Sequence, residues 1–149
     1  MVIAVILVRS QIGTKPNIRK TLRLLKLTRK NHCVVLKEDS TYKGMLMKCK
    51  DYITWGPISK ETLLSILRKR GKCPGDKKLT LTDEELNDLV DAIEKGGKTA
   101  KDKLMEKKIK PVFRCHPPKK GWKSIKKAYP KGALGFRGEN MNNLIMRMI

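Results

Sequence analysis

Apolar residues in the first third of the chain alternate between short continuous runs and stripes with helical spacing. The run at 2–8 is rich in β-branched residues, which predicts a buried strand. Ile18, Leu22 and Leu25 recur at the spacing of a helix, and Pro16 suits a first helical position because its missing N–H would be unpaired there. The predicted order is strand, helix, strand, helix, strand, at residues 2–8, 18–30, 32–36, 41–51 and 52–55, with Ser40 or Thr41 capping the second helix. This alternation predicts a small sheet with helices on one face.

The pattern becomes wholly helical over residues 58–110. Ser59 is placed to cap a helix that ends near Gly71. Thr82 and Glu85 have the spacing of a capping box, in which each side chain bonds a free backbone N–H of the other residue. That box predicts an acidic helix over 83–94, ended by Gly96-Gly97, and another helix follows at 101–108. We expect the acidic helix to face away from any polyanion.

The last third of the chain returns to the sheet. A strand is predicted at 111–115, a long irregular basic loop at 116–138 and a final helix at 139–148, with Met141 and Leu144 facing inward. The pattern divides the chain into a core at 1–57, a helical extension at 58–110, and a returning strand, basic loop and C-terminal helix at 111–149.

The net charge of the chain narrows the classes of function that it can have. The 149 residues include 35 Lys and Arg against 14 Asp and Glu, a formal net charge of +21, and positions 1–37 contain no acid. Such an excess opposes compaction unless a polyanion balances it, so it favours nucleic acid as the partner. No apolar run is long enough to span a bilayer, so no membrane partner is expected. Because no secretory signal is present, we expect the four cysteines to be reduced in the cytoplasm.

The first candidate site is a basic turn followed by a basic helix. A helix N-terminus after a glycine-containing turn presents free N–H groups and a positive dipole end, which suit a phosphate. Arginines three and four residues apart can follow an RNA backbone. The candidate RNA-binding residues are Arg9, Ser10, Gln11, Gly13, Thr14, Lys15, Arg19, Lys20, Arg23 and Lys26. The alternative is a solvated helix face, although such faces ordinarily mix charges of both signs.

The second candidate site is the 116–138 loop. Its lysines supply charge, and Trp122 or Tyr129 could pack against a ribose or base. The alternative is a loop that is disordered until RNA binds it.

Metal binding and catalysis are not expected. His32-Cys33 and Cys115-His116 supply four possible zinc ligands, but neighbouring side chains on a strand point to opposite faces. Cys33 and Cys115 are more simply explained as small residues of the hydrophobic core. The sequence contains no phosphate-binding glycine loop or arrangement for nucleophilic catalysis, so we expect no enzyme activity, cofactor or small-molecule substrate.

Several motifs resemble the L-thirty family of large-subunit ribosomal proteins, in its long archaeal and eukaryotic form, called L-seven in eukaryotes. The resemblance covers essentially the whole chain. The matching motifs are Arg9-Ser10-x-Ile12-Gly13, Thr21-Leu22-x-x-Leu25-x-Leu27, Glu38-Asp39, Gly44-Met45, Tyr52-Ile53-x-Trp55-Gly56, Lys69-Arg70-Gly71, Leu81-Thr82-Asp83, Phe113-Arg114-x-His116-Pro117-Pro118-x-x-Gly121 and Leu134-Gly135-Phe136-Arg137-Gly138. Thr28 to Asn31 departs from the glycine-rich turn of the bacterial form.

The resemblance implies an α+β fold with a ferredoxin-like core, an antiparallel sheet with two helices, plus a helical extension. It implies a non-enzymatic structural role in the large ribosomal subunit, in contact with 23S-type rRNA, nearby 5S rRNA and neighbouring ribosomal proteins. Besides the basic turn, it assigns RNA contacts to Lys69, Arg70, Lys119, Lys120, Lys123 and Arg137, and Trp122 is added as a possible stacking residue. The rival interpretations are a free-standing basic RNA chaperone or a chromatin-like nucleic-acid-binding protein, and an RNA-modifying enzyme.

Overall fold

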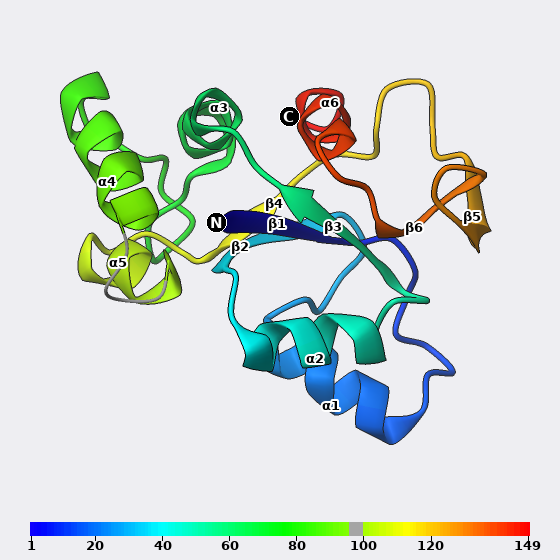
Figure 1. The fold of residues 1–149 in the computed structure, drawn as a ribbon. Helices are drawn as coiled ribbons and strands as arrows, with labels where there is room; N and C mark the ends of the chain where they lie inside the picture. The colour runs from blue at the N-terminus through cyan, green and yellow to red at the C-terminus, as the bar shows by residue number, and fades with distance from the viewer. Residues whose placement is uncertain (96–99) are drawn as a thin grey trace.

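A computed structural model describes residues 1–95 and 100–149 of the chain. Its centre is a six-stranded sheet with the strand order β4-β2-β1-β3-β6-β5 (Figure 1). The strands are β1 (Val2–Leu7), β2 (His32–Lys37), β3 (Ile53–Pro57), β4 (Val112–Arg114), β5 (Ser124–Ala128) and β6 (Gly132–Phe136). Antiparallel pairs join β1 to β2 and β3, and β2 to β4, whereas β6 lies parallel to β3.

Two helices, α1 (Pro16–Leu24) and α2 (Ser40–Lys48), cover one face of the sheet (Figure 1). Every second residue of β1 points toward them, and Val5 is fully buried in the same apolar cluster as Leu22 and Leu46. This arrangement confirms the predicted α+β class with a ferredoxin-like core.

On the opposite face, α3 (Lys60–Arg70) and α6 (Asn140–Met146) lie over the sheet, while α4 (Asp83–Lys95) and α5 (Ala100–Glu106) lie beside it, next to β2 (Figure 1). Residues of all four helices join one apolar cluster on this side. Ala4 and Ile6 of β1 pack there in one cluster with Leu63 of α3, Leu104 of α5 and Ile145 of α6. All residues of β1 are therefore buried, which explains why its sequence is continuously apolar instead of alternating. Helix periodicity alone did not predict that the 58–110 extension closes this second face.

That cluster draws residues from all three predicted parts of the chain, through Ala4, Leu63 and Met141. The division of the chain at 1–57, 58–110 and 111–149 stays a prediction. In the described residues, no helix is both long and apolar enough to cross a lipid bilayer.

The predicted caps of the extension are present. Ser59 Oγ accepts from Thr62 N at 3.4 Å, and the Thr82–Glu85 box forms through Thr82 N to Glu85 Oε2 at 3.1 Å. Gly96-Gly97, the predicted end of α4, lies outside the described residues. The predicted cap of the second helix was wrong by one position, because Asp39 Oδ1 accepts from Ser40 N at 2.8 Å.

The first helix ends at Leu24, not near Lys30 as predicted. Leu27 N donates to Leu22 O and Lys26 N donates to Arg23 O, both at 2.9 Å, which is the hydrogen-bonding of a Schellman motif. Lys26 takes the left-handed conformation with φ +61°, and buried Leu27 contacts the same apolar cluster as Leu22. Glycine usually occupies the left-handed position of this motif. Because Lys26 stands there instead, the end of α1 could not be predicted from the sequence.

Residues 116–138 were predicted as an irregular loop, and this prediction was wrong for its second half. Strands β5 and β6 lie within it. Thr54 Oγ1 donates to Gly135 O at 3.0 Å and Arg137 N donates to Trp55 O at 2.9 Å, so β3 holds β6 in place. β5 then forms the edge of the sheet, with an irregular register. Thr54 and Gly135 are 81 positions apart in the chain, so no local sequence pattern could predict that β3 and β6 pair.

Candidate nucleic-acid interface

Arg9 anchors the basic turn that follows β1. Its guanidinium carbon lies 5.2 Å from the centroid of the Tyr52 ring, and its Nη1 donates to Asp51 O at 3.3 Å. The backbone N–H groups of Val8 and Arg9 both donate to Tyr52 O. A cation held over an aromatic ring is pre-positioned, so the charge can meet a phosphate at a lower entropic cost.

The rest of the turn is held by its own polar groups. Gln11 Nε2 donates to Leu27 O, and Thr14 N donates to Gln11 O at 3.2 Å. Ser10 Oγ accepts from Ile12 N at 3.3 Å. Gly13 has φ +72°, a conformation that L side chains adopt at a cost. Of these predicted RNA-contact residues, Thr14 is buried and can only support the turn from beneath.

The turn leads directly into α1. Lys15 is its N-cap and provides no side-chain cap, while Pro16 is at the first helical turn, as predicted. The first turn of α1 contains no acid, so no side-chain charge within that turn offsets the positive end of the helix dipole. Lys15, Lys20 and Arg23 are exposed, whereas Arg19 is half-buried and donates through Nη2 to Thr14 O at 3.5 Å.

A second group of basic and aromatic residues surrounds a hollow of about 270 Å³ next to β5 and β6. Arg137 is fixed there, because its Nη2 donates to Ala133 O at 3.1 Å and its guanidinium carbon lies 4.8 Å from the Tyr129 ring centroid. Burial lowers the pKa of Arg137 from its ordinary value. The other residues around this hollow are Lys120, Gly121, Trp122, Lys123, Leu144 and Arg147. Trp122 packs partly against the core, so only part of its ring faces solvent.

The two candidate sites meet in space. Another hollow, of about 460 Å³, is lined by Arg9, Gly13 and Lys15 from the turn together with Lys126 of β5 and Leu134 of β6, and Asp51 is the one acid among the described residues in its lining. Figure 1 shows the turn, β5 and β6 at one end of the molecule, with α4 at the other. We call this end the basic surface, formed by Arg9, Gly13, Lys15, Arg19, Lys120, Trp122, Lys123, Lys126 and Arg137. Lys20 and Arg23 follow along α1, and Arg23 O accepts from Lys26 N at 2.9 Å.

Four predicted residues lie elsewhere or are used differently. Lys26 has left α1 and lines a pocket beside β4. Lys69 and Arg70 end α3, on the sheet face opposite α1, and Arg70 Nε is buried without a hydrogen-bond partner among the described residues. Lys119 is exposed beside the hollow of about 270 Å³, where its carbonyl accepts from Arg147 Nε at 3.0 Å.

Lys126 and Arg147 were not among the RNA-binding residues predicted from the sequence, and Tyr129 was named only as a possible ribose or base contact. One signal could have found Lys126: positions 107–138 contain no acid, just as positions 1–37 contain none. These two acid-free stretches supply the two halves of the basic surface. Arg147 carries no such signal, because it stands alone in an apolar helix end.

The possible zinc ligands do not form a metal site. No group of three or more His, Cys, Asp or Glu side chains that could hold a metal ion occurs in the part of the chain that the structure describes. A hydrogen bond with the neighbouring Cys115 thiol, followed by burial, raises the pKa of Cys33 well above its ordinary value. Cys33 is therefore a protonated core thiol at neutral pH.

Comparison with known proteins places these features in a family. The model of the family described as "Ribosomal protein L30p/L7e" matches residues 3–53, which include the basic turn and α1. The chain is 41% identical to the large ribosomal subunit protein uL30 of Methanococcus maripaludis, with 100% of both chains covered. It is 43% identical to that of Methanococcus vannielii over 100% of both, and 44% identical to that of Methanobrevibacter smithii over 97% of this chain and 98% of the relative.

The fold and the cation-rich end are typical of a nucleic-acid-binding structural protein. More particularly, the chain belongs to the L30p/L7e (uL30) family of ribosomal proteins. This confirms the resemblance found in the sequence. The family is one of structural proteins that act in translation in the cytoplasm, not of enzymes.

Proposed function

We propose that this chain is a structural constituent of the large ribosomal subunit that binds folded 23S-type rRNA, near 5S rRNA, through the basic surface. The observation that carries the proposal is the meeting of two acid-free stretches, 1–37 and 107–138, around the hollow between Arg9, Lys15 and Lys126. In the described residues, no ion pair involves any of these three cations. Neighbouring large-subunit proteins are the expected protein partners, as the relatives' names imply.

Phosphate contacts are expected to supply most of the affinity. If about six to ten phosphates are neutralised, binding should fall about 10³- to 10⁵-fold between about 50 and 200 mM salt. RNA shape should matter more than base sequence, because the deep groove of an A-form helix is too narrow for side chains to read. Lys69 and Arg70, on the other face of the sheet, would reach a different stretch of RNA from the basic surface.

Charge reversal on the basic surface tests the proposal. Lys15→Glu with Lys126→Glu changes two exposed side chains that line the hollow between the turn and β5, without touching the core. The matched control is Lys77→Glu with Lys78→Glu, two exposed lysines of the extension that produce the same change in net charge. We expect the first pair to lower the slope of log affinity against log salt by about two, and the control to leave it unchanged. Equal effects of the two pairs would reject the basic surface as the binding site.

Sedimentation separates a subunit constituent from a free-standing RNA chaperone. The protein should stay with the large subunit through a high-salt wash, whereas a chaperone would be released into the free pool. Cross-linking of lysine and arginine side chains to rRNA then tests the finer assignment. Cross-links from the basic surface to 23S-type nucleotides close to 5S rRNA are expected, and cross-links confined to other faces would contradict it.

A further inference from the structure

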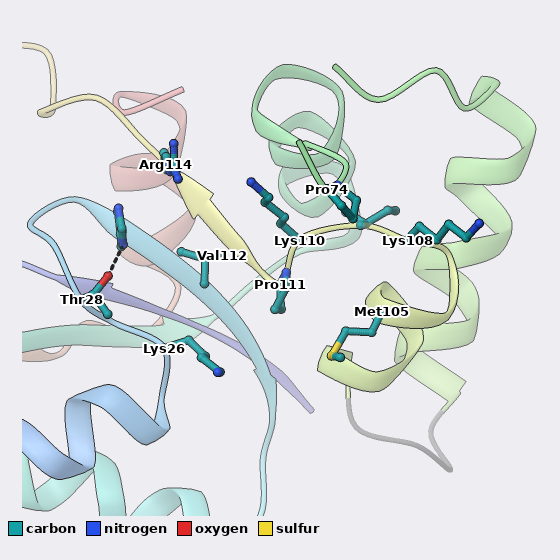
Figure 2. A pocket seen from close by; sticks show the side chains of 11 residues that line it. Lys26, Thr28, Pro74, Met105, Lys108, Lys110, Pro111, Val112 and Arg114 are labelled. Atoms are coloured by element: carbon teal, nitrogen blue, oxygen red, sulfur yellow. Dashed lines mark hydrogen bonds between the residues drawn. The ribbon is translucent and has the colours of Figure 1, made fainter. Parts of the chain in front are cut away.

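A pocket of about 650 Å³ opens at the β4 edge of the sheet, where the helical extension meets the core (Figure 2). It lies at the opposite edge of the sheet from β5. Strands are spaced about 4.8 Å apart, so the two edges of a six-stranded sheet are about 24 Å apart. A ligand in this pocket is therefore separate from one on the basic surface.

The inner wall of the pocket is apolar. Ile109 is buried, and Val112 of β4 is half-buried with its side chain packed against the core. Met105 of α5 lies at the mouth and is 55% exposed. Pro74 and Pro111 complete the wall. A pocket of this size and apolar character is typical of small-ligand sites.

Cationic side chains surround that wall. Figure 2 shows Lys26 on one side and Met105 and Lys108 on the other. Lys110 and Arg114 are already paired with Asp76, at 2.5 and 3.2 Å. Lys26 and Lys108 are exposed, and neither forms an ion pair with another described residue. Two cations at the mouth thus stay available for an anion and repel a basic peptide.

Two neutral polar groups lie at the edge of the pocket. Thr28 Oγ1 is 3.4 Å from His32 Nδ1, as the dashed line in Figure 2 marks. Burial, followed by the charges of Arg114 and Arg29, lowers the pKa of His32 from its ordinary value, so the imidazole is neutral at pH 7. A neutral imidazole and a hydroxyl each offer a donor and an acceptor, which is the chemistry that pairs with the edge of a base.

We propose that this pocket receives an unstacked nucleotide of a single-stranded or bulged rRNA segment, with the base against the apolar wall and the phosphate at Lys26 and Lys108. This rests on the proposed function, and adds a second RNA contact at the other edge of the sheet. The flat apolar faces, polar edge and anionic backbone of a nucleotide match the three parts of the pocket. The protein then bridges two RNA segments.

Two exposed methionines provide a matched test. Met105→Glu places a negative charge at the mouth, while Met47→Glu places the same charge on α2, where Met47 is 59% exposed. The probe is transcribed large-subunit rRNA of Methanococcus vannielii, with 4-thiouridine incorporated for cross-linking. We expect Met105→Glu to weaken binding about tenfold and Met47→Glu less than about twofold, because one base stack and one phosphate contact are lost. Wild-type cross-links should include the peptides that contain Met105 or residues 108–114.

The other outcomes separate the pocket from the basic surface. If Met105→Glu binds like Met47→Glu while Lys15→Glu with Lys126→Glu weakens binding, the pocket proposal fails and the proposed function stands. If Met105→Glu binds RNA normally but enters large subunits poorly, the pocket holds a protein and the proposal is overturned. A wild-type protein that ignores the rRNA overturns the proposed function together with the pocket.

Discussion

The basic surface and the helical extension are both densely charged, yet their charges have different partners. In the extension, Arg68 Nη2 lies 2.8 Å from Asp83 Oδ1, and Lys60 pairs with Asp91. On the basic surface, Arg9 and Arg137 are held by aromatic rings and carbonyl groups, not by acids. Exposed ion pairs contribute little stability, but they neutralise charge within the chain. In the described part of the chain, Asp51 is the one acid that lines the hollow between Arg9, Lys15 and Lys126. The like charges around it repel one another, so most of their counter-charge has to come from another molecule.

The largest expected effect tests whether the extension is part of the same folding unit as the core. Phe113 of β4 is fully buried in the cluster that joins the sheet to α3, α4 and α5. We expect Phe113→Ala to destabilise the protein by about 3–5 kcal/mol, because it leaves a cavity between the two parts. Urea unfolding followed by circular dichroism should show one transition at a lower midpoint. Two separate transitions would show that the extension at 58–110 unfolds independently.

A smaller effect is expected from two glycines that differ only in backbone conformation. An added Cβ would meet nothing within 4 Å at either Gly13 or Gly44. Gly13, on the basic surface, has φ +72°, so Gly13→Ala should cost about 1–2 kcal/mol. Gly44 is exposed within α2, so Gly44→Ala should stabilise the protein by about 0.5–1 kcal/mol.

The same urea measurement compares both glycine variants. Gly13→Ala should also weaken rRNA binding, because the turn that carries Arg9 and Lys15 is shifted. A stabilising Gly13→Ala would show that the left-handed conformation of the turn is unimportant.

The smallest effect is expected at the acidic end. Glu84→Lys with Asp88→Lys reverses two exposed charges on α4, and neither residue has an ion pair among the described residues. Because α4 lies at the end opposite the basic surface, rRNA affinity should stay unchanged or rise by less than about threefold through long-range attraction. Filter binding at two salt concentrations measures the rRNA affinity. A large loss of affinity would place α4 at the RNA contact and remove the contrast between the two ends.

Local sequence signals predicted the elements that are stabilised locally. The Thr82–Glu85 box, the Ser59 cap and Pro16 each mark a helix start through groups within four residues of one another. The stop of α1 was missed, because Lys26 takes a conformation in which glycine is expected. The strands β5 and β6 were missed because their partners lie far away in the chain.

The candidate site also has one part that the sequence predicted and one part that it did not. The basic turn and α1 were predicted because Arg9, Lys15 and Arg23 lie in a stretch without acids. That Lys126 lies beside this turn, and that Lys26 lies at a different pocket, could not be predicted from residue spacing. Helical periodicity extended past Leu24 placed Lys26 on the wrong surface.

The amino-acid sequence by itself determined the large positive charge, the buried first strand and the family to which the chain belongs. These properties depend on residue type and near-neighbour spacing. Only the tertiary structure decided which cations share a surface, that the extension covers the second sheet face, and that a pocket opens beside β4. Those features arise where segments distant in sequence pack together, and the energy of that packing depends on the shapes of both surfaces at once.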